Sequence, residues 1–208
     1  MKQIYKSYFL YFLILVYVSG SIGFVLNPTF FSSFTPFTLL LTCFVFLIHI
    51  PIPYKNYLIA FFSIALLGFF IEIIGVKTGL VFGNYSYGNA LGYKFFNVPL
   101  IISINWAMLI CASIAAINSM FTNKIVALSL SALIITLIDL LIEQVAPKLD
   151  FWKFQNGLPD IQNSIGWFVF AFGVAYLFYP IISKGNRNVS IIILILQIIF
   201  FTSLNLFI

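Results

Sequence analysis

The sequence predicts an all-α protein: a polytopic integral membrane bundle of about seven transmembrane helices, in a single domain over residues 1–208. Three observations lead to this fold class. Hydrophobic residues make up 62% of the chain and charged residues only 7%, and the mean hydropathy is +1.13. A soluble domain of this length cannot bury so much apolar surface, so the bilayer must act as the solvent. The apolar runs are continuous rather than alternating, which favours helices over a β-barrel.

Seven apolar segments approach the roughly 20-residue length that spans a bilayer. In chain order, the predicted spans are Tyr8–Leu26, Phe34–Ile50, Tyr57–Val76, Val98–Ile117, Ile125–Gln144, Ile161–Ile182 and Val189–Phe207. The second is the shortest. The first follows Lys2 and Lys6 as a signal peptide would, but it is long and lacks a small-residue cleavage site, so we expect a retained helix.

The distribution of charge predicts the orientation. With seven spans, alternate loops share a side, and the side of the N-terminus carries six cations and no acid: Lys2, Lys6, Lys55, Lys124, Lys184 and Arg187. The other side carries four cations and two acids: Lys77, Lys94, Lys148, Lys153, Asp150 and Asp160. The positive-inside rule therefore favours a cytoplasmic N-terminus in a multi-pass protein of the plasma membrane. The cations form no basic stripe, so the expected partner is the lipid bilayer and not nucleic acid.

Three acids lie near one end of the predicted spans. Glu72 is close to the end of the third span, and Asp139 and Glu143 are in the last turns of the fifth. Because both helices run in the same direction, the three carboxyl groups should lie at similar depth. Asp139 and Glu143, four residues apart, share one helix face and would repel if both were ionised, so we expect at least one to keep its proton. The alternative is neutralisation at the interface by a loop lysine: Lys77, Lys148 or Lys153.

A glycine- and tyrosine-rich segment, GLVFGNYSYGNALGY, follows Glu72 over residues 79–93. Glycines permit tight turns, and tyrosines suit an interface where the ring is buried and the hydroxyl is wet. We expect an aromatic cap over the acid-lined end of the bundle; the alternative is an ordinary interfacial belt. The next spans each begin from that end with a proline, an asparagine and a tryptophan, a faint internal repeat whose polar and aromatic members are Asn105, Trp106, Asn163 and Trp167.

Two blocks carry a family resemblance. The first is EIIGVKTGLVFGNYSYGNALG…NVPLIISINW, over residues 72–106, and the second is DLLIEQVAPKLDFWKFQNGLPDIQNSIGWF, over residues 139–168. Together they resemble the carotenoid biosynthesis membrane proteins of the CruF type, the carotenoid 1,2-hydratases. The second block departs from the family pattern, since Gln144 stands where proline is frequent and the tyrosine-rich approach to Pro159 is reduced to QNGLPD. These departures leave the particular carotenoid open.

The resemblance implies hydration of the C1=C2 double bond of an acyclic (ψ) carotenoid end group, giving a tertiary 1-hydroxy carotenoid. A neutral carboxylic acid protonates C2, water captures the tertiary cation at C1, and a carboxylate takes a proton from that water. No metal or redox cofactor is required. A polyene of roughly 30 Å is about as long as the bilayer core is thick, so an end-group reaction at one face is geometrically reasonable.

Ten residues follow as candidates. Those for acid–base work, without separate roles, are Glu72, Asp139 and Glu143. Those for binding the lipophilic carotenoid or positioning water are Tyr85, Tyr87, Asn105, Trp106, Trp152, Asn163 and Trp167. Aromatic faces can stabilise the transient cation.

Two alternative functions stay open. A membrane lycopene cyclase begins with the same protonation, but a neighbouring double bond captures the cation and a ring forms. A non-catalytic seven-helix receptor or transporter is the other. A retinal-binding receptor needs a lysine in the last span, and residues 189–208 contain none, whereas a transporter usually spreads polar groups through both halves of the membrane.

Overall fold

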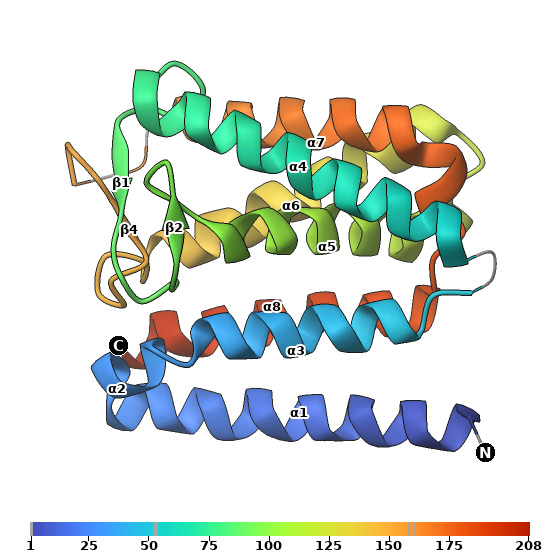
Figure 1. Ribbon diagram of the computed structural model, residues 1–208, viewed down its shortest axis with the longest axis horizontal. Helices are drawn as coiled ribbons and strands as arrows, with labels where there is room; N and C mark the ends of the chain where they lie inside the picture. Colours follow the sequence, from blue (N-terminus) through green and yellow to red (C-terminus); the bar gives the residue numbers. More distant parts are fainter. Residues whose placement is uncertain (1, 52–53, 158, 160) are drawn as a thin grey trace.

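A computed structural model describes residues 2–51, 54–157, 159 and 161–208 as a bundle of antiparallel helices (Figure 1). One of the five acids, Asp160, lies outside the described residues. The helices are α1 (Lys2–Leu26), α2 (Pro28–Ser32), α3 (Thr35–Ile48), α4 (Tyr54–Thr78), α5 (Leu100–Ile117), α6 (Lys124–Glu143), α7 (Ile161–Ile182) and α8 (Arg187–Phe207), with a short 3₁₀ helix at Asn118–Met120. The predicted all-α membrane bundle is confirmed.

Six helices in the described part are long and apolar enough to cross a membrane: α1, α4, α5, α6, α7 and α8. The predicted second span, Phe34–Ile50, is a shorter helix, because α3 has 14 residues. The chain turns before it through α2, whose N-cap Asn27 accepts a hydrogen bond from Phe30 N at 3.1 Å. At its other end Pro51 disfavours further helix.

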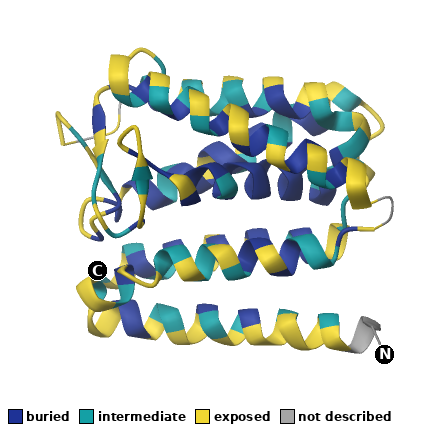
Figure 2. Cartoon of the chain, in the orientation of Figure 1, coloured by how far each residue is buried: buried dark blue, intermediate teal, exposed yellow. Residues whose placement is uncertain are grey.

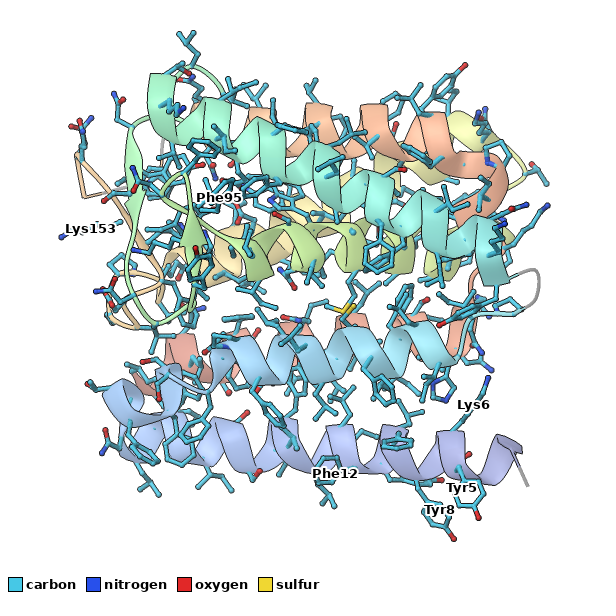
Figure 3. The ribbon with its side chains drawn as sticks, viewed as in Figure 1. Tyr5, Lys6, Tyr8, Phe12, Phe95 and Lys153 are labelled. Carbon is cyan, nitrogen blue, oxygen red and sulfur yellow. The ribbon has the colours of Figure 1, made fainter. Side chains whose placement is uncertain are left out.

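Helix α5 lies at the centre of the bundle, and most of its side chains are buried. It packs against α3, α4, α6, α7 and α8, while α1 lies at the edge against α3 and α8. Figure 2 shows the resulting contrast, with α5 mostly buried and one flank of α1 exposed. Tyr5, Tyr8 and Phe12 point away from the bundle on that flank, each more than half exposed (Figure 3). Such a surface needs lipid around it.

Two small antiparallel sheets form a cap over one end of the bundle. Strand β1 (Tyr85–Tyr87) pairs with β4 (Trp152–Phe154), and β2 (Lys94–Phe95) pairs with β3 (Val98–Pro99). The β1–β4 pair joins the loop after α4 to the loop after α6, with Tyr87 directly opposite Trp152. The expected aromatic cap is therefore present, but it is held by strands that the sequence did not predict.

The position of Pro99 relative to the start of its helix differs from the prediction. The sequence places it in the first turn of a helix that begins at Val98, whereas α5 begins at Leu100 and Pro99 is its N-cap residue, with φ −65° and ψ 128°. Pairing of Val98 and Pro99 with Lys94 and Phe95 keeps this segment extended. The extended entry brings the cap directly onto the first turn of α5.

Candidate active site

A cavity lies beneath the cap and between the helices at that end. Its space that is unoccupied by protein atoms is about 710 Å³ when the part that is open to the surroundings is included. Its wall is largely apolar and aromatic, with contributions from Leu91, Ile102, Leu109, Ile135 and Phe201. The carboxyl-bearing residues in the wall are Glu72 and Asp139. We call this space the acid chamber.

Glu72 enters the chamber from the last part of α4 and is held by three donors. The hydroxyls of Tyr85 and Tyr87 donate to Oε2 at 2.5 and 2.8 Å, and Trp106 Nε1 donates to Oε1 at 2.8 Å. Glu72 is only 2% exposed. These donors come from the cap and from α5, so the carboxyl group is fixed by two separate parts of the fold. An acceptor with three donors suits the ionised form.

The two tyrosines of the cap stay neutral donors. Burial raises the pKa of Tyr85 above its ordinary value, and the neighbouring Glu72 charge raises it further. The pKa of Tyr87 is raised by the same two causes in the same order. Both phenols therefore keep their protons at physiological pH, and their O–H groups remain directed at Glu72.

Asp139 and Glu143 form the second acidic group, in the last turns of α6. Asn163, near the start of α7, donates from Nδ2 to Asp139 Oδ2 at 2.9 Å and to Glu143 Oε1. The two carboxyl groups also lie close enough to interact directly. All three residues are 4% exposed. A single amide thus ties two buried acids together, on the opposite helix pair from Glu72.

Two buried oxygen atoms near these acids lack a partner among the described residues: Asn105 Oδ1 and Glu143 Oε2. Asn105 is 9% exposed and lies in the chamber wall. A buried acceptor left without a hydrogen bond is costly, and an ordered water commonly satisfies it. The wall therefore offers an acceptor for a water molecule inside the chamber.

Aromatic rings cover the chamber from several directions. Tyr87 packs edge-on against Trp152, with ring centroids 6.1 Å apart, and Phe154 packs against Tyr85 at 5.8 Å. Trp167 lies in the wall and stacks on Trp106 behind it. The chamber consequently combines few polar groups with many ring faces.

Eight of the ten candidate residues line the acid chamber: Glu72, Tyr85, Tyr87, Asn105, Asp139, Trp152, Asn163 and Trp167. The other two are not in its wall. Glu143 is linked to it through Asn163, and Trp106 lies behind Trp167, where it binds Glu72.

Sequence reasoning missed other wall residues, including Thr35, Phe82 and Gln197. Gln197 is 1% exposed and is a lone amide inside the apolar run of α8. That isolated polar residue is the signal that would have found it, because amides in spanning helices usually face the interior.

The proposed neutralisation of the acids by loop lysines does not occur among the described residues. Lys77 lies over the ring of Phe96, and Lys148 donates to the carbonyl of Ile208. Lys153 projects from β4 at the cap end of the molecule (Figure 3). Within the described part of the chain, no group of three or more His, Cys, Asp and Glu side chains is arranged to hold a metal ion.

The fold and this site define an integral membrane protein with a buried, acid-bearing, aromatic chamber near one end of its helices. The chain matches the family model described as carotenoid biosynthesis protein over residues 34–208. It therefore belongs to the carotenoid biosynthesis protein family, which indicates an enzymatic role in that pathway and a lipophilic substrate. This confirms the predicted membership of the carotenoid biosynthesis membrane proteins, over a longer stretch than the two blocks that suggested it, whereas the CruF type stays a prediction. No curated protein and no solved structure matches the chain.

Proposed function

We propose that this protein adds water across the C1=C2 double bond of an acyclic (ψ) carotenoid end group and forms a tertiary 1-hydroxy carotenoid. A proton is added at C2, the oxygen of water bonds to C1, and that water loses one proton. The single observation that carries the proposal is the meeting of Asp139 and Glu72 in the wall of one buried aromatic chamber. The resemblance to CruF-type hydratases in residues 72–168 favours the same reaction.

The pair formed by Asp139 and Glu143 is suited to donate the proton. Two carboxyl groups held around the Asn163 amide repel when both are ionised, and a proton retained by the pair removes that repulsion. Asp139 lies in the chamber wall and Glu143 does not. Asp139 therefore gives the proton of the pair to the alkene, and the proton that Glu72 takes from the attacking water must return to the pair before the next turnover.

Glu72 is suited to receive the proton from water. Its three donors stabilise the anion, and a fixed anion facing the chamber also favours the cation at C1. The free carbonyl oxygen of Asn105 can hold the attacking water in the same space. Proton donor and proton acceptor then lie on different helix pairs, so that one carboxyl group need not perform both tasks.

The aromatic wall is suited to the cationic intermediate. The ring faces of Trp152, Trp167 and Phe154 border the chamber and attract a cation without forming a bond to it. Their bulk also matches the apolar end group. An alkene is a weak base, so its protonation requires that the cation be stabilised as it forms.

A polar hollow on the far side of the cap favours hydration over cyclisation. It contains about 400 Å³ of unoccupied space and is lined in part by Ser86, Asn89, Asp150 and Lys153. Tyr87 and Trp152 border both this hollow and the acid chamber. Water can therefore approach along the polar residues of the hollow, and the rings of Tyr87 and Trp152 lie between the hollow and the acid chamber. A cyclase needs no such supply, because its cation must be kept from water.

Expression of the chain in a lycopene-producing host, followed by pigment analysis, tests the proposal. We expect a more polar carotenoid that is heavier than lycopene by one molecule of water. A cyclic product of unchanged mass would assign the chain to the cyclase alternative. If the protein is inserted in the membrane and the lycopene is unchanged, the proposal that this protein hydrates lycopene is wrong.

A further inference from the structure

A second cavity lies beside the acid chamber, on the side of the bundle where α1 packs. Its unoccupied space is about 380 Å³ when the part that is open to the surroundings is included. Val16, Tyr17 and Gly20 line it from α1, and Phe200 lines it from α8. We call this space the α1 pocket. It is part of neither acid group and has no role in the proton transfers proposed above.

The α1 pocket adjoins the acid chamber. Four residues, two from α3 and two from α8, line both spaces: Thr35, Leu39, Gln197 and Phe201. The wall that the two spaces share is therefore formed by α3 and α8. In Figure 1 these helices separate α1 from the helices that carry the acids, α4 and α6. A ligand that occupies both spaces would cross the bundle from the acids towards α1.

Hydrogen bonds hold the polar groups at this shared wall. Gln197 Nε2 donates to the hydroxyl of Tyr17 at 3.1 Å, and that hydroxyl lies 3.2 Å from Thr42 Oγ1. Thr42 in turn donates to the carbonyl of Thr38 at 2.7 Å. These bonds tie Gln197 to α1 and α3. Apart from Thr35, whose buried hydroxyl has no hydrogen-bond partner among the described residues, the rest of the α1 pocket is aromatic and aliphatic.

Gly20 keeps part of this space open. A Cβ atom built on Gly20 would have Phe200 as its nearest neighbour, at 3.7 Å, which is an ordinary contact. The position therefore tolerates alanine, whereas a large side chain there would enter the α1 pocket. The absence of a side chain at Gly20 is not explained by close helix packing.

We infer that the α1 pocket binds the isoprenoid chain of the substrate whose end group lies in the acid chamber. This inference rests on the proposed function, because it takes the chamber as the site of the end group. An end group that reacts beside Asp139 leaves a long, rigid, apolar chain to be accommodated. The α1 pocket is largely apolar, shares a wall with the chamber and lies away from the acids, so it suits that chain.

Pigment retention tests this inference. Wild type, Gly20→Phe, Gly20→Ala and Gly173→Phe are purified from a lycopene-producing host, and total carotenoid per mole of protein is measured by absorbance. Gly173 is the matched control, because a Cβ there meets nothing within 4 Å on the exposed side of α7. We expect Gly20→Phe to lower the retained carotenoid by about tenfold, because the phenylalanine ring fills the α1 pocket where the isoprenoid chain would bind. The other two variants should match wild type.

The outcomes separate this inference from the proposed function. The inference that the α1 pocket binds the isoprenoid chain would be wrong if Gly20→Phe retained as much carotenoid as wild type, or if the wild-type protein retained no carotenoid. Suppose that the wild-type protein retains carotenoid but forms no hydroxylated product, and that Gly20→Phe loses the carotenoid. That result would support binding of the isoprenoid chain in the α1 pocket and would contradict the proposed hydration. If Gly20→Phe fails to yield a monodisperse protein, Val16→Phe fills the same pocket from the next turn of α1 and is read in the same way.

Discussion

At the scale of single residues, function depends on how differently three similar acids are surrounded. Glu72 accepts hydrogen bonds from Tyr85, Tyr87 and Trp106, whereas Asp139 shares one amide with Glu143. The first arrangement stabilises an anion and the second favours a shared proton. Chemically similar side chains thereby acquire opposite tasks in the proposed hydration.

Replacement of each chamber acid by its amide tests this division. Asp139→Asn and Glu72→Gln should each lower hydrated product by roughly 100- to 10,000-fold, the usual contribution of a general acid or base, while the protein stays inserted. Product formation at the wild-type level by both chamber variants would refute the assignment.

The tyrosine donors give a second test at this scale. Tyr85→Phe and Tyr87→Phe each remove one hydrogen bond to Glu72 and keep the ring. Hydrogen bonds to charged groups are worth about 1.5–3 kcal/mol, so we expect turnover to fall by roughly 10- to 100-fold. Tyr93→Phe in the same loop, which is 75% exposed, should have no effect. Equal turnover in all three variants would show that these hydroxyls do not support catalysis.

At the scale of elements, the cap depends on contact between two loops that are distant in sequence. Gly88 N donates to Phe151 O at 2.8 Å, and the Asp150 carboxylate accepts from Asn89 N at 2.7 Å. A Cβ on Gly88 would collide with the backbone oxygen of Asp150. A residue without a side chain is therefore needed where β1 ends, and the β1–β4 register that directs the tyrosines to Glu72 depends on it.

Gly88→Val should detach the cap without unfolding the helices. We expect protease cleavage within residues 79–99 to become faster and hydrated product to be lost, because overpacking costs roughly 1–3 kcal/mol at a site with few other contacts. Helix content by circular dichroism should not change. Gly173→Val, in open space on α7, is the control. A protease-resistant, active Gly88→Val protein would contradict this account of the cap.

At the scale of the whole molecule, the cap lies at one end of the bundle and the N-terminus at the other (Figure 1). Cap residues line the acid chamber, which therefore lies at the end away from the N-terminus. We propose that the cap end faces outward across the plasma membrane, since the positive-inside rule favours a cytoplasmic N-terminus. Water for the reaction would then enter from the outer side through the polar hollow at the cap.

Single cysteines can report this orientation. Lys153 lies on β4 at the cap and Lys55 near the start of α4 at the other end, and both are exposed. The native Cys43 and Cys111 are buried and should not react. On intact cells, a membrane-impermeant maleimide should label Lys153→Cys and spare Lys55→Cys until the cells are opened. The reverse pattern would invert the orientation.

The sequence predicted most of the helical architecture and much of the candidate site. Continuous apolar runs placed the seven helical segments, including both ends of α7 at Ile161 and Ile182. The similar depth of the three acids followed from the common direction of the two helices that carry them. Strands β1 and β4 were not predicted, because three-residue strands acquire their order from pairing across the fold. Phe82 was missed because burial in a wall depends on neighbours that are distant in sequence, whereas Gln197 had a local signal, an amide inside an apolar run, that was not used.

The sequence by itself therefore determined that the protein lies in the lipid bilayer, that its fold is a helical bundle, and that its acids gather at one end of the helices. These conclusions need only composition and helix direction, which can be read from the chain without its tertiary contacts. Only the tertiary structure decided that Tyr85, Tyr87 and Trp106 surround Glu72, that Asn163 joins Asp139 to Glu143, and that a second pocket beside α1 adjoins the acid chamber. Those relations exist only after separate helices pack, since each hydrogen bond and each cavity wall needs groups from more than one of them.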